Sequence, residues 1–151
     1  MTRVSPNDAP DPRTAPSFLI KDASRELVRQ AEVLMRPLGI GMASLPVLVA
    51  LKAGEASTQA DLARLLQVEQ PSMAQMLARL ERDGLVQRSP DPARKRVQRV
   101  ALTELAVERL PQARAALAAG NQRALEGFTP DEVATFVDYL QRVNANLRDA
   151  A

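Results

Sequence analysis

Apolar residues recur at every third or fourth position in the first part of the chain, the spacing of one face of an α-helix. A first helix is therefore predicted from Ser17 to about Met35, with a row of apolar residues at Leu27, Ala31, Leu34 and Leu38. Pro37 and Gly39 are of the type that ends a helix. A short apolar segment over residues 42–52 predicts a second helix, in which Pro46 tightens or displaces the first turn.

Two further helices are predicted on either side of a brief turn at residues 67–70. Thr58 and Asp61 form a capping box: the Thr58 hydroxyl accepts from the Asp61 amide, and the Asp61 carboxylate accepts from the Thr58 amide. The helix that follows runs to about Leu66 and is expected to bury Leu62, Leu65 and Leu66. The next helix has Pro71 in its first turn and ends at Gly84. Its apolar stripe is Met73, Met76, Leu77 and Leu80, and its polar face is Ser72, Gln75, Arg79 and Arg82.

After Gly84 the pattern changes from helical spacing to alternation. Residues 85–88 and 97–102 predict two short strands. The segment between them holds Arg94, Lys95 and Arg96, so we expect a hairpin with a long, basic tip.

Two long helices are predicted in the last third of the chain. Thr103 caps the first of them, which Pro111 and Gly120 are expected to bend or break. Thr129 and Glu132 form a full capping box at the start of the second, with Pro130 at its first helical position. That last helix carries a single apolar stripe, Val133, Phe136, Val137, Leu140, Val143 and Leu147.

The order helix, short turn, helix, hairpin predicts a fold that is mostly α with a small two-stranded β wing, a winged helix-turn-helix. The charge distribution agrees with this fold, because residues 58–103 carry 8 basic and 5 acidic groups whereas residues 104–151 carry 5 and 7. A local excess of positive charge favours a polyanion as partner. The alternative for the charge alone is a solvated loop.

Composition excludes several classes of function. The 151 residues include no cysteine and no histidine, which removes disulfides, Cys/His zinc sites and a Ser-His-Asp triad. No catalytic residues, metal or cofactor are predicted, and the chain is not expected to be an enzyme. The longest apolar run, Leu45 to Leu51, has seven residues, far fewer than the roughly 20 that span a membrane. We therefore expect a cytoplasmic protein with no membrane partner.

The exposed face of the helix after the turn suits double-stranded DNA. Gln75 offers a donor and an acceptor to a base edge, as adenine requires. Ser72 and the first-turn amides suit a phosphate, and Arg79 and Arg82 lie further along the same face. Each residue alone is more often solvated helix surface, so the interpretation depends on the combination. The predicted DNA-binding residues are Gln70, Pro71, Ser72, Gln75, Arg79, Arg82, Arg94, Lys95 and Arg96.

Three stretches resemble one family: Thr58-Gln59-Ala60-Asp61-Leu62-Ala63, the run from Glu69 through Gly84-Leu85-Val86, and Val100-Ala101-Leu102-Thr103. They are similar to the multiple antibiotic resistance regulator (MarR) family of bacterial transcription factors. The resemblance implies a recognition helix at residues 70–82, a wing arginine at Arg96 and an obligate homodimer. The family wing usually reads Asp-Pro-x-Asp-Arg-Arg, whereas Arg94 stands here for the second aspartate, which is associated with holding a wing arginine.

Residues 1–16 hold four of the eleven prolines and almost no large apolar residues, so they are expected to form a flexible arm. With the resemblance, residues 17–151 are expected to form a single MarR-like domain. The DNA-binding lobe covers about residues 42–103, and dimerisation helices cover about residues 17–38 and 104–148. The dimer interface is predicted at Leu19, Ile20, Phe136, Leu140, Val143 and Leu147. An effector pocket for a small aromatic acid is predicted at Arg25, Arg29, Leu45 and Leu48, and the alternative is that these residues are simply core.

The resulting hypothesis is a sequence-specific transcriptional regulator, a repressor that binds a pseudo-palindromic operator as a homodimer. A small aromatic or phenolic effector would release it from DNA. The alternative is a winged-helix module for protein interaction, or a scaffold, without DNA binding. Salt dependence discriminates between them, because phosphate contacts release counterions and apolar protein contacts do not.

Overall fold

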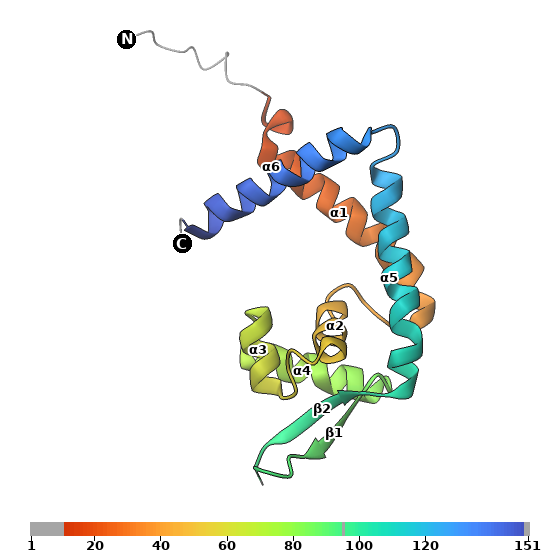
Figure 1. The fold of residues 1–151 in the computed structure, drawn as a ribbon, viewed down its shortest axis with the longest axis vertical. Helices are drawn as coiled ribbons and strands as arrows, with labels where there is room; N and C mark the ends of the chain where they lie inside the picture. Colours follow the sequence, from red (N-terminus) through yellow and green to blue (C-terminus); the bar gives the residue numbers. More distant parts are fainter. Residues whose placement is uncertain (1–10, 95, 150–151) are drawn as a thin grey trace.

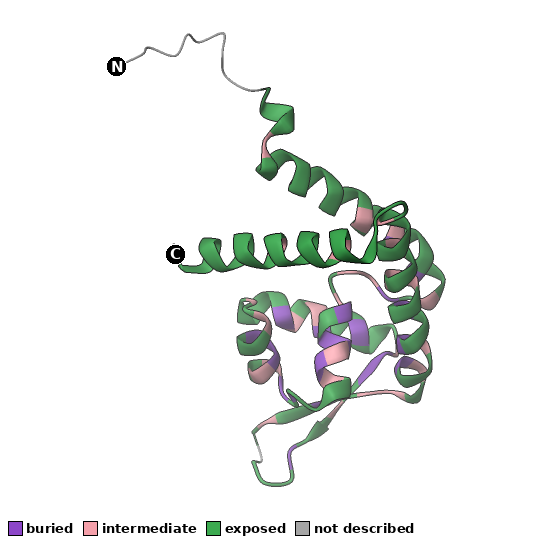
Figure 2. Cartoon of the chain, turned by 45° about the horizontal axis from the view of Figure 1, so that its top comes forward, coloured by how far each residue is buried: buried purple, intermediate pink, exposed green. Residues whose placement is uncertain are grey.

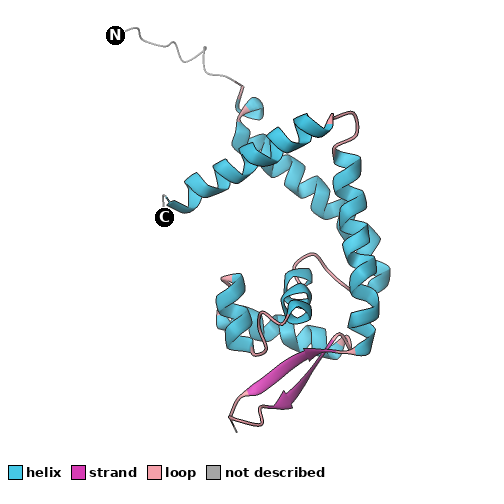
Figure 3. Ribbon diagram, in the orientation of Figure 1, coloured by secondary structure: helices cyan, strands magenta, loops and turns pink. Residues whose placement is uncertain are grey.

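The computed structural model describes residues 11–94 and 96–149. Its helices and strands follow the predicted order (Figures 1 and 3). They are η1 (Pro12–Thr14), α1 (Pro16–Met35), η2 (Arg36–Leu38), α2 (Leu45–Ala53), α3 (Gln59–Leu66), α4 (Gln70–Arg82), β1 (Val86–Pro90), β2 (Gln98–Leu102), α5 (Glu104–Ala124) and α6 (Pro130–Asp149). The first ten residues of the predicted arm and Lys95 of the hairpin tip lie outside the described residues.

The described chain has two parts that differ in how far they are buried. Helices α2, α3 and α4 and the hairpin form a lobe, and α1, α5 and α6 extend away from it (Figure 1). Buried residues gather in the lobe and along its junction with α1 and α5, whereas α6 has none (Figure 2). The lobe therefore packs as one unit with the adjoining parts of α1 and α5, whereas α6 buries no residue against the described chain.

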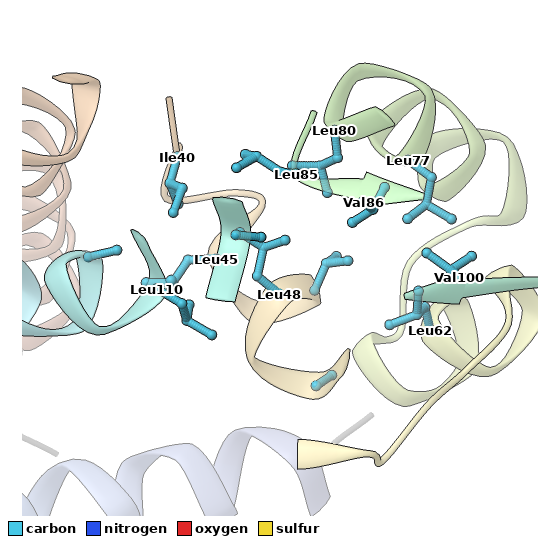
Figure 4. Packing of buried hydrophobic residues seen from close by; sticks show 14 of the residues in the cluster. Ile40, Leu45, Leu48, Leu62, Leu77, Leu80, Leu85, Val86, Val100 and Leu110 are labelled. Atoms are coloured by element: carbon cyan, nitrogen blue, oxygen red, sulfur yellow. The ribbon is translucent and has the colours of Figure 1, made fainter. Parts of the chain in front are cut away.

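The hydrophobic core joins every element of the lobe to α5. Leu48 of α2, Leu62 of α3 and Leu77 of α4 are all 0% exposed, and Val86 and Val100 close the core from the hairpin (Figure 4). Leu45 and Leu110 belong to the same cluster and connect α2 to α5 (Figure 4). Burial of this apolar surface orients α4 and the hairpin relative to each other.

The hairpin is antiparallel, with Val86 opposite Leu102 and Pro90 opposite Gln98. A third short segment joins its edge: Thr58 pairs with Arg99, and the Val100 amide donates to the Ser57 carbonyl at 2.8 Å. This pairing attaches the start of α3 to β2, so the hairpin and the helix-turn-helix are connected by main-chain hydrogen bonds as well as by the core.

The two capping boxes differ in one bond. The Thr58 hydroxyl accepts from the Asp61 amide at 3.1 Å, as expected, but the Asp61 carboxylate accepts from the Thr58 hydroxyl at 2.8 Å instead of from the amide. In the second box the Glu132 carboxylate does accept from the Thr129 amide, at 2.8 Å. Aspartate is one methylene shorter than glutamate, which explains why the expected reciprocal bond is made only by Glu132.

Two other expectations are corrected. Leu65, expected to be buried, is 43% exposed, because α3 packs through only one side. Pro111 does not break α5, which runs without interruption from Glu104 to Ala124. The proline withholds an N–H from the Val107 carbonyl, but Val107 is 41% exposed, so water can donate there.

None of the helices in the described ranges, 11–94 and 96–149, is long and apolar enough to cross a membrane.

Candidate nucleic-acid interface

The turn between α3 and α4 is held by main-chain geometry. Gln67 adopts a left-handed conformation, with φ at 54°, and ends α3. The Val68 amide then donates back to the Ala63 carbonyl at 2.9 Å, which satisfies a free carbonyl at the helix end. The Met73 amide donates to the Glu69 carbonyl at 2.9 Å as α4 begins. The two helices therefore meet through a short and well-bonded turn.

The predicted recognition face lies on the outside of α4. Gln70, Pro71, Ser72, Gln75, Arg79 and Arg82 are all exposed, whereas Met73, Leu77 and Leu80 on the opposite side are buried. Arg82 donates to Asp83 at 3.0 Å, but Arg79 forms no ion pair with another described residue. The face thus presents amide, hydroxyl and guanidinium groups outward, with apolar packing behind them.

The hairpin tip is organised around Asp91, whose side chain is only 1% exposed. Its carboxylate accepts from the Ala93 amide at 2.8 Å and from the Arg94 amide at 3.2 Å. It also accepts from the guanidinium groups of Arg94, at 3.3 Å, and of Arg99, at 3.2 Å. The bond from the Ala93 amide, followed by those from Arg99 and Arg94, holds the pKa of Asp91 below its usual range despite burial.

The charged side chains of the tip remain largely in solvent. Arg94, which stands where the family has an aspartate, is 61% exposed in its side chain although it is bonded to Asp91. Arg96 is exposed, and Arg99 is 53% exposed in its side chain. Of the predicted tip residues, Lys95 lies outside the described residues. The tip therefore combines a main chain bonded to Asp91 with long, exposed cationic side chains that can bind phosphate.

The sequence interpretation missed Asp91 and Arg99 as parts of this site. Asp91 followed by Pro92 is a typical turn start, because an aspartate carboxylate bonds the amides two and three residues later. That signal was available in the sequence. Arg99 had no such signal, because only the register of the hairpin places it beside Asp91.

Arg88 has a different role from the tip arginines. Its side chain is 28% exposed, and its Nε lies 3.4 Å from the Glu81 carboxylate. This pair joins β1 to the C-terminal part of α4. The Nε is buried and makes no hydrogen bond with a described residue, so its contact with Glu81 is an ion pair without a hydrogen bond.

The residues of the predicted effector pocket lie in two different environments. Leu45 and Leu48 are 5% and 0% exposed and belong to the core. Arg25 and Arg29 are on α1, where Arg25 pairs with Asp22 and Arg29 with Glu26. The Arg29 bonds, with one from Gln30, lower the pKa of Glu26 to about 2. Both guanidinium groups are thus already engaged by carboxylates.

The predicted dimer-interface residues lie on the outer surfaces of α1 and α6. Leu19 and Ile20 are 54% and 40% exposed, and Phe136 and Leu147 are 44% and 67% exposed. Val143 is also exposed and Leu140 is half-buried. The rings of Phe128 and Phe136 lie close to each other in a tilted arrangement, with centroids 6.5 Å apart. An apolar surface of this extent is unusual for a single chain in water.

Within the two described ranges, no group of three or more Asp and Glu side chains is placed to hold a metal ion. The arrangement offers hydrogen-bond donors and positive charge on two neighbouring elements, α4 and the hairpin tip.

Comparisons with known proteins agree on one family. A family model described as MarR family matches residues 38–97. An uncharacterised HTH-type transcriptional regulator, YybA of Bacillus subtilis (strain 168), is 30% identical over 89 residues, which are 59% of this chain and 59% of that relative. The match thus spans about three fifths of the relative's length.

Solved structures extend the similarity to most of the chain. The transcriptional regulator SlyA is 25% identical with a TM-score of 0.77, covering 91% of this chain and 96% of that one. A mutant MarR from E. coli in complex with operator DNA is 29% identical with a TM-score of 0.74, covering 84% and 91%.

Proposed function

We propose that the chain is a MarR-family transcriptional regulator that represses transcription as an operator-binding homodimer, supported by the family match over residues 38–97 and by the similarity in fold over most of the chain. The observation that carries this proposal is the exposed face of α4 beside a hairpin whose basic tip is anchored by Asp91. In the proposed complex α4 enters the major groove, and the tip reaches the adjacent minor groove or phosphate row.

In this proposal α4 contacts both bases and phosphates, whereas the wing contributes positive charge. Gln75 lies one turn into α4 and would contact a base edge, while Ser72 and the first-turn amides would bind phosphate. Arg79, which has no ion-pair partner among the described residues, is the stronger candidate for a second phosphate contact on α4. Arg94, Lys95 and Arg96 would supply positive charge at the wing. These contacts give affinity through phosphates and specificity through bases.

The exposed faces of α1 and α6 support the homodimer. Leu19, Phe136 and Leu147 would be covered by the same surface of a second copy, as a two-fold axis requires. A symmetric dimer presents two α4 helices to two inverted half-sites about one helical turn apart. In bacteria such a regulator works in the cytoplasm, where the DNA is.

The effector part of the proposal concerns the junction of α1, α2 and α5. Arg109 of α5 donates to the Leu38 carbonyl at 2.9 Å, and Glu32 of α1 accepts from the Met42 amide at 2.7 Å. These bonds tie the dimerisation helices to the start of the lobe. An aromatic acid that displaced Glu26 from Arg29 would favour a different lobe spacing, one that no longer matches successive grooves.

The test of the proposal is the salt dependence of binding to a duplex selected from a randomised library by the purified protein. Several phosphate contacts should make the logarithm of the association constant fall linearly with the logarithm of salt concentration, by about 0.9 per phosphate. Binding of no duplex, or binding that ignores salt, would favour the protein-interaction alternative. Inserting five base pairs between the half-sites should abolish high affinity if the two lobes dock symmetrically.

The effector is tested separately by titrating salicylate into the DNA complex. Release of DNA at concentrations that saturate the protein supports a ligand-responsive repressor. Unchanged DNA affinity under those conditions would leave a constitutive repressor.

A further inference from the structure

Two glutamines at the starts of consecutive helices are joined by a hydrogen bond. Gln59 is the first residue of α3 and Gln70 is the first residue of α4. The Gln59 Nε2 donates to the Gln70 Oε1 at 3.1 Å, across the turn of the helix-turn-helix. Gln70 is exposed at the beginning of the recognition helix, whereas Gln59 is half-buried. The two side chains therefore meet at the end of α4 that a base would approach.

The position of Gln59 is itself well fixed. It follows Thr58, which is 5% exposed, caps α3 and pairs with Arg99 of β2. The Ser57 carbonyl accepts from the Val100 amide at 2.8 Å. The Gln59 side chain thus extends from a main-chain segment that is hydrogen-bonded to the hairpin and continues into α3. It is a firm support for the more exposed Gln70.

The hydrogen bond leaves the recognition groups of Gln70 free. A side-chain carbonyl oxygen has two lone pairs, so the bond from Gln59 leaves one acceptor position, and both N–H donors of Gln70 are unused. One acceptor and one donor on the same amide edge are what adenine requires in the major groove, at its N6 and N7. In the arrangement that the structure gives, the Gln70 oxygen faces Gln59, and the bond limits how the Gln70 amide can rotate.

We propose that Gln70 reads an adenine in each half-site, and that Gln59 is the positioning residue that orients the Gln70 amide without touching the base. This inference rests on the proposed DNA-binding function and assigns part of its specificity. A glutamine with three free torsions must be ordered on binding, and prior orientation by Gln59 removes part of that cost. Losing the support should reduce affinity for the preferred duplex by about 3- to 10-fold.

The experiment compares base preferences of four proteins in a selection from randomised duplexes: wild type, Gln59→Met, Gln70→Met and the double variant. Methionine has similar length and helix propensity but no amide, so it removes the bond with little change in helix stability. Gln122→Met, at an exposed position of α5, is the matched control. Thermal unfolding of each variant verifies the fold, and Gln59→Ala repeats the test with a smaller side chain.

The expected result is a loss of adenine preference at one position per half-site in Gln70→Met, and a partial loss at that same position in Gln59→Met. The Gln59 substitution should have no further effect in the Gln70→Met background. Equal weakening for all sequences, in both backgrounds, would instead show that Gln59 contacts phosphate directly. An unchanged preference in Gln59→Met would also overturn the proposal. In either case sequence-specific binding by the wild type would keep the proposed function intact.

Discussion

At the scale of single residues, the hairpin tip depends most on Asp91. Its carboxylate holds the Ala93 and Arg94 amides and brings the positive charges of Arg94 and Arg99 to one acceptor. Without it, two main-chain amides lose their acceptor and two guanidinium groups lose the negative charge between them. Arg94 stands where the wing of the resembling family has an aspartate. It therefore adds a cation that pairs with Asp91, and Asp91 still anchors the tip.

We predict that Asp91→Ala lowers the free energy of unfolding, because the Ala93 and Arg94 amides and two guanidinium groups lose their shared acceptor. Chemical denaturation measures this, and amide hydrogen exchange should speed up at Ala93 and Arg94 but not in α3. Arg96→Ala removes an exposed charge from the same tip and is the control, with a change near zero. Equal stability of Asp91→Ala and wild type would contradict this account of the tip.

The pH dependence of the same group follows from its lowered pKa. The unfolded carboxyl titrates near its ordinary value of 3.8 and the folded one below it, so the ionised form stabilises the fold above that value. The contribution is lost as the pH falls through the folded pKa. The stability advantage of wild type over Asp91→Asn should therefore be full at neutral pH and shrink as the pH falls below 3.8. A difference independent of pH would mean that the charge of Asp91 is unimportant.

Two polar residues of α4 should affect DNA binding in different ways. Gln75→Ala is expected to cost about 1–3 kcal/mol at the preferred site and to relax selection at one base position. Arg79→Ala should weaken all duplexes alike and reduce the salt slope by about 1. Arg82, already bonded to Asp83, should change the slope less than Arg79. Fluorescence anisotropy over a salt series measures both effects, and a sequence-dependent loss in Arg79→Ala would contradict the phosphate role.

At the scale of elements, the beginning of α3 does more than start a helix. Thr58 caps the helix through its hydroxyl and pairs with Arg99 through its main chain, so α3 and the hairpin share one attachment point. The capping bond and the pairing with Arg99 are thus made by the same residue. Loss of the cap should affect the orientation of the whole helix-turn-helix.

We predict that Thr58→Ala lowers the free energy of unfolding by about 0.5–2 kcal/mol. Thr58→Ser keeps the hydroxyl and should retain most of the stability, which separates the capping bond from the loss of side-chain volume. Thermal and denaturant unfolding, followed by circular dichroism, compare the two variants. If serine and alanine destabilise equally, the methyl group and not the cap is the important part of Thr58.

Most helices were predictable as elements because their signals are local. The boxes at Thr58 and Thr129 and the cap at Thr103 mark three helix starts by residue type alone. Burial was predicted less well, as Leu65 shows: its spacing fits an apolar stripe, but α3 is only eight residues long and leaves that position in solvent. Periodicity states which residues share a face, and packing decides how wide the covered part of that face is.

At the scale of the whole molecule, one long helix, α6, packs on little of the described chain besides Phe128. No residue of α6 is buried, and its apolar stripe includes Phe136 and Leu147. The capping box at Thr129 stabilises its start, but a long amphipathic helix gains most of its stability from packing. A second copy of the chain is the partner we propose.

We predict that Phe136→Asp or Leu140→Asp abolishes the dimer and, with it, DNA binding, because a charge would be buried at the two-fold axis. Sedimentation measures the mass, and binding to the selected duplex measures the function. Asp138→Asn, on an exposed and polar part of the same helix, is the matched control and should remain dimeric. A variant that is monomeric and still binds the operator with full affinity would refute the role of α6.

The sequence by itself determined the order of the elements and the starts of the helices that carry a capping residue, because capping, proline position and periodicity are encoded within a few neighbouring residues. Only the tertiary structure decided that Asp91 accepts from Arg99, that Gln59 donates to Gln70, and that Arg88 lies beside Glu81. Each of these pairs joins residues on different elements, or on two strands whose register had to be known. Hydrogen bonds depend on distances within a few tenths of an ångström, which the core sets by packing α2, α3, α4 and the hairpin together.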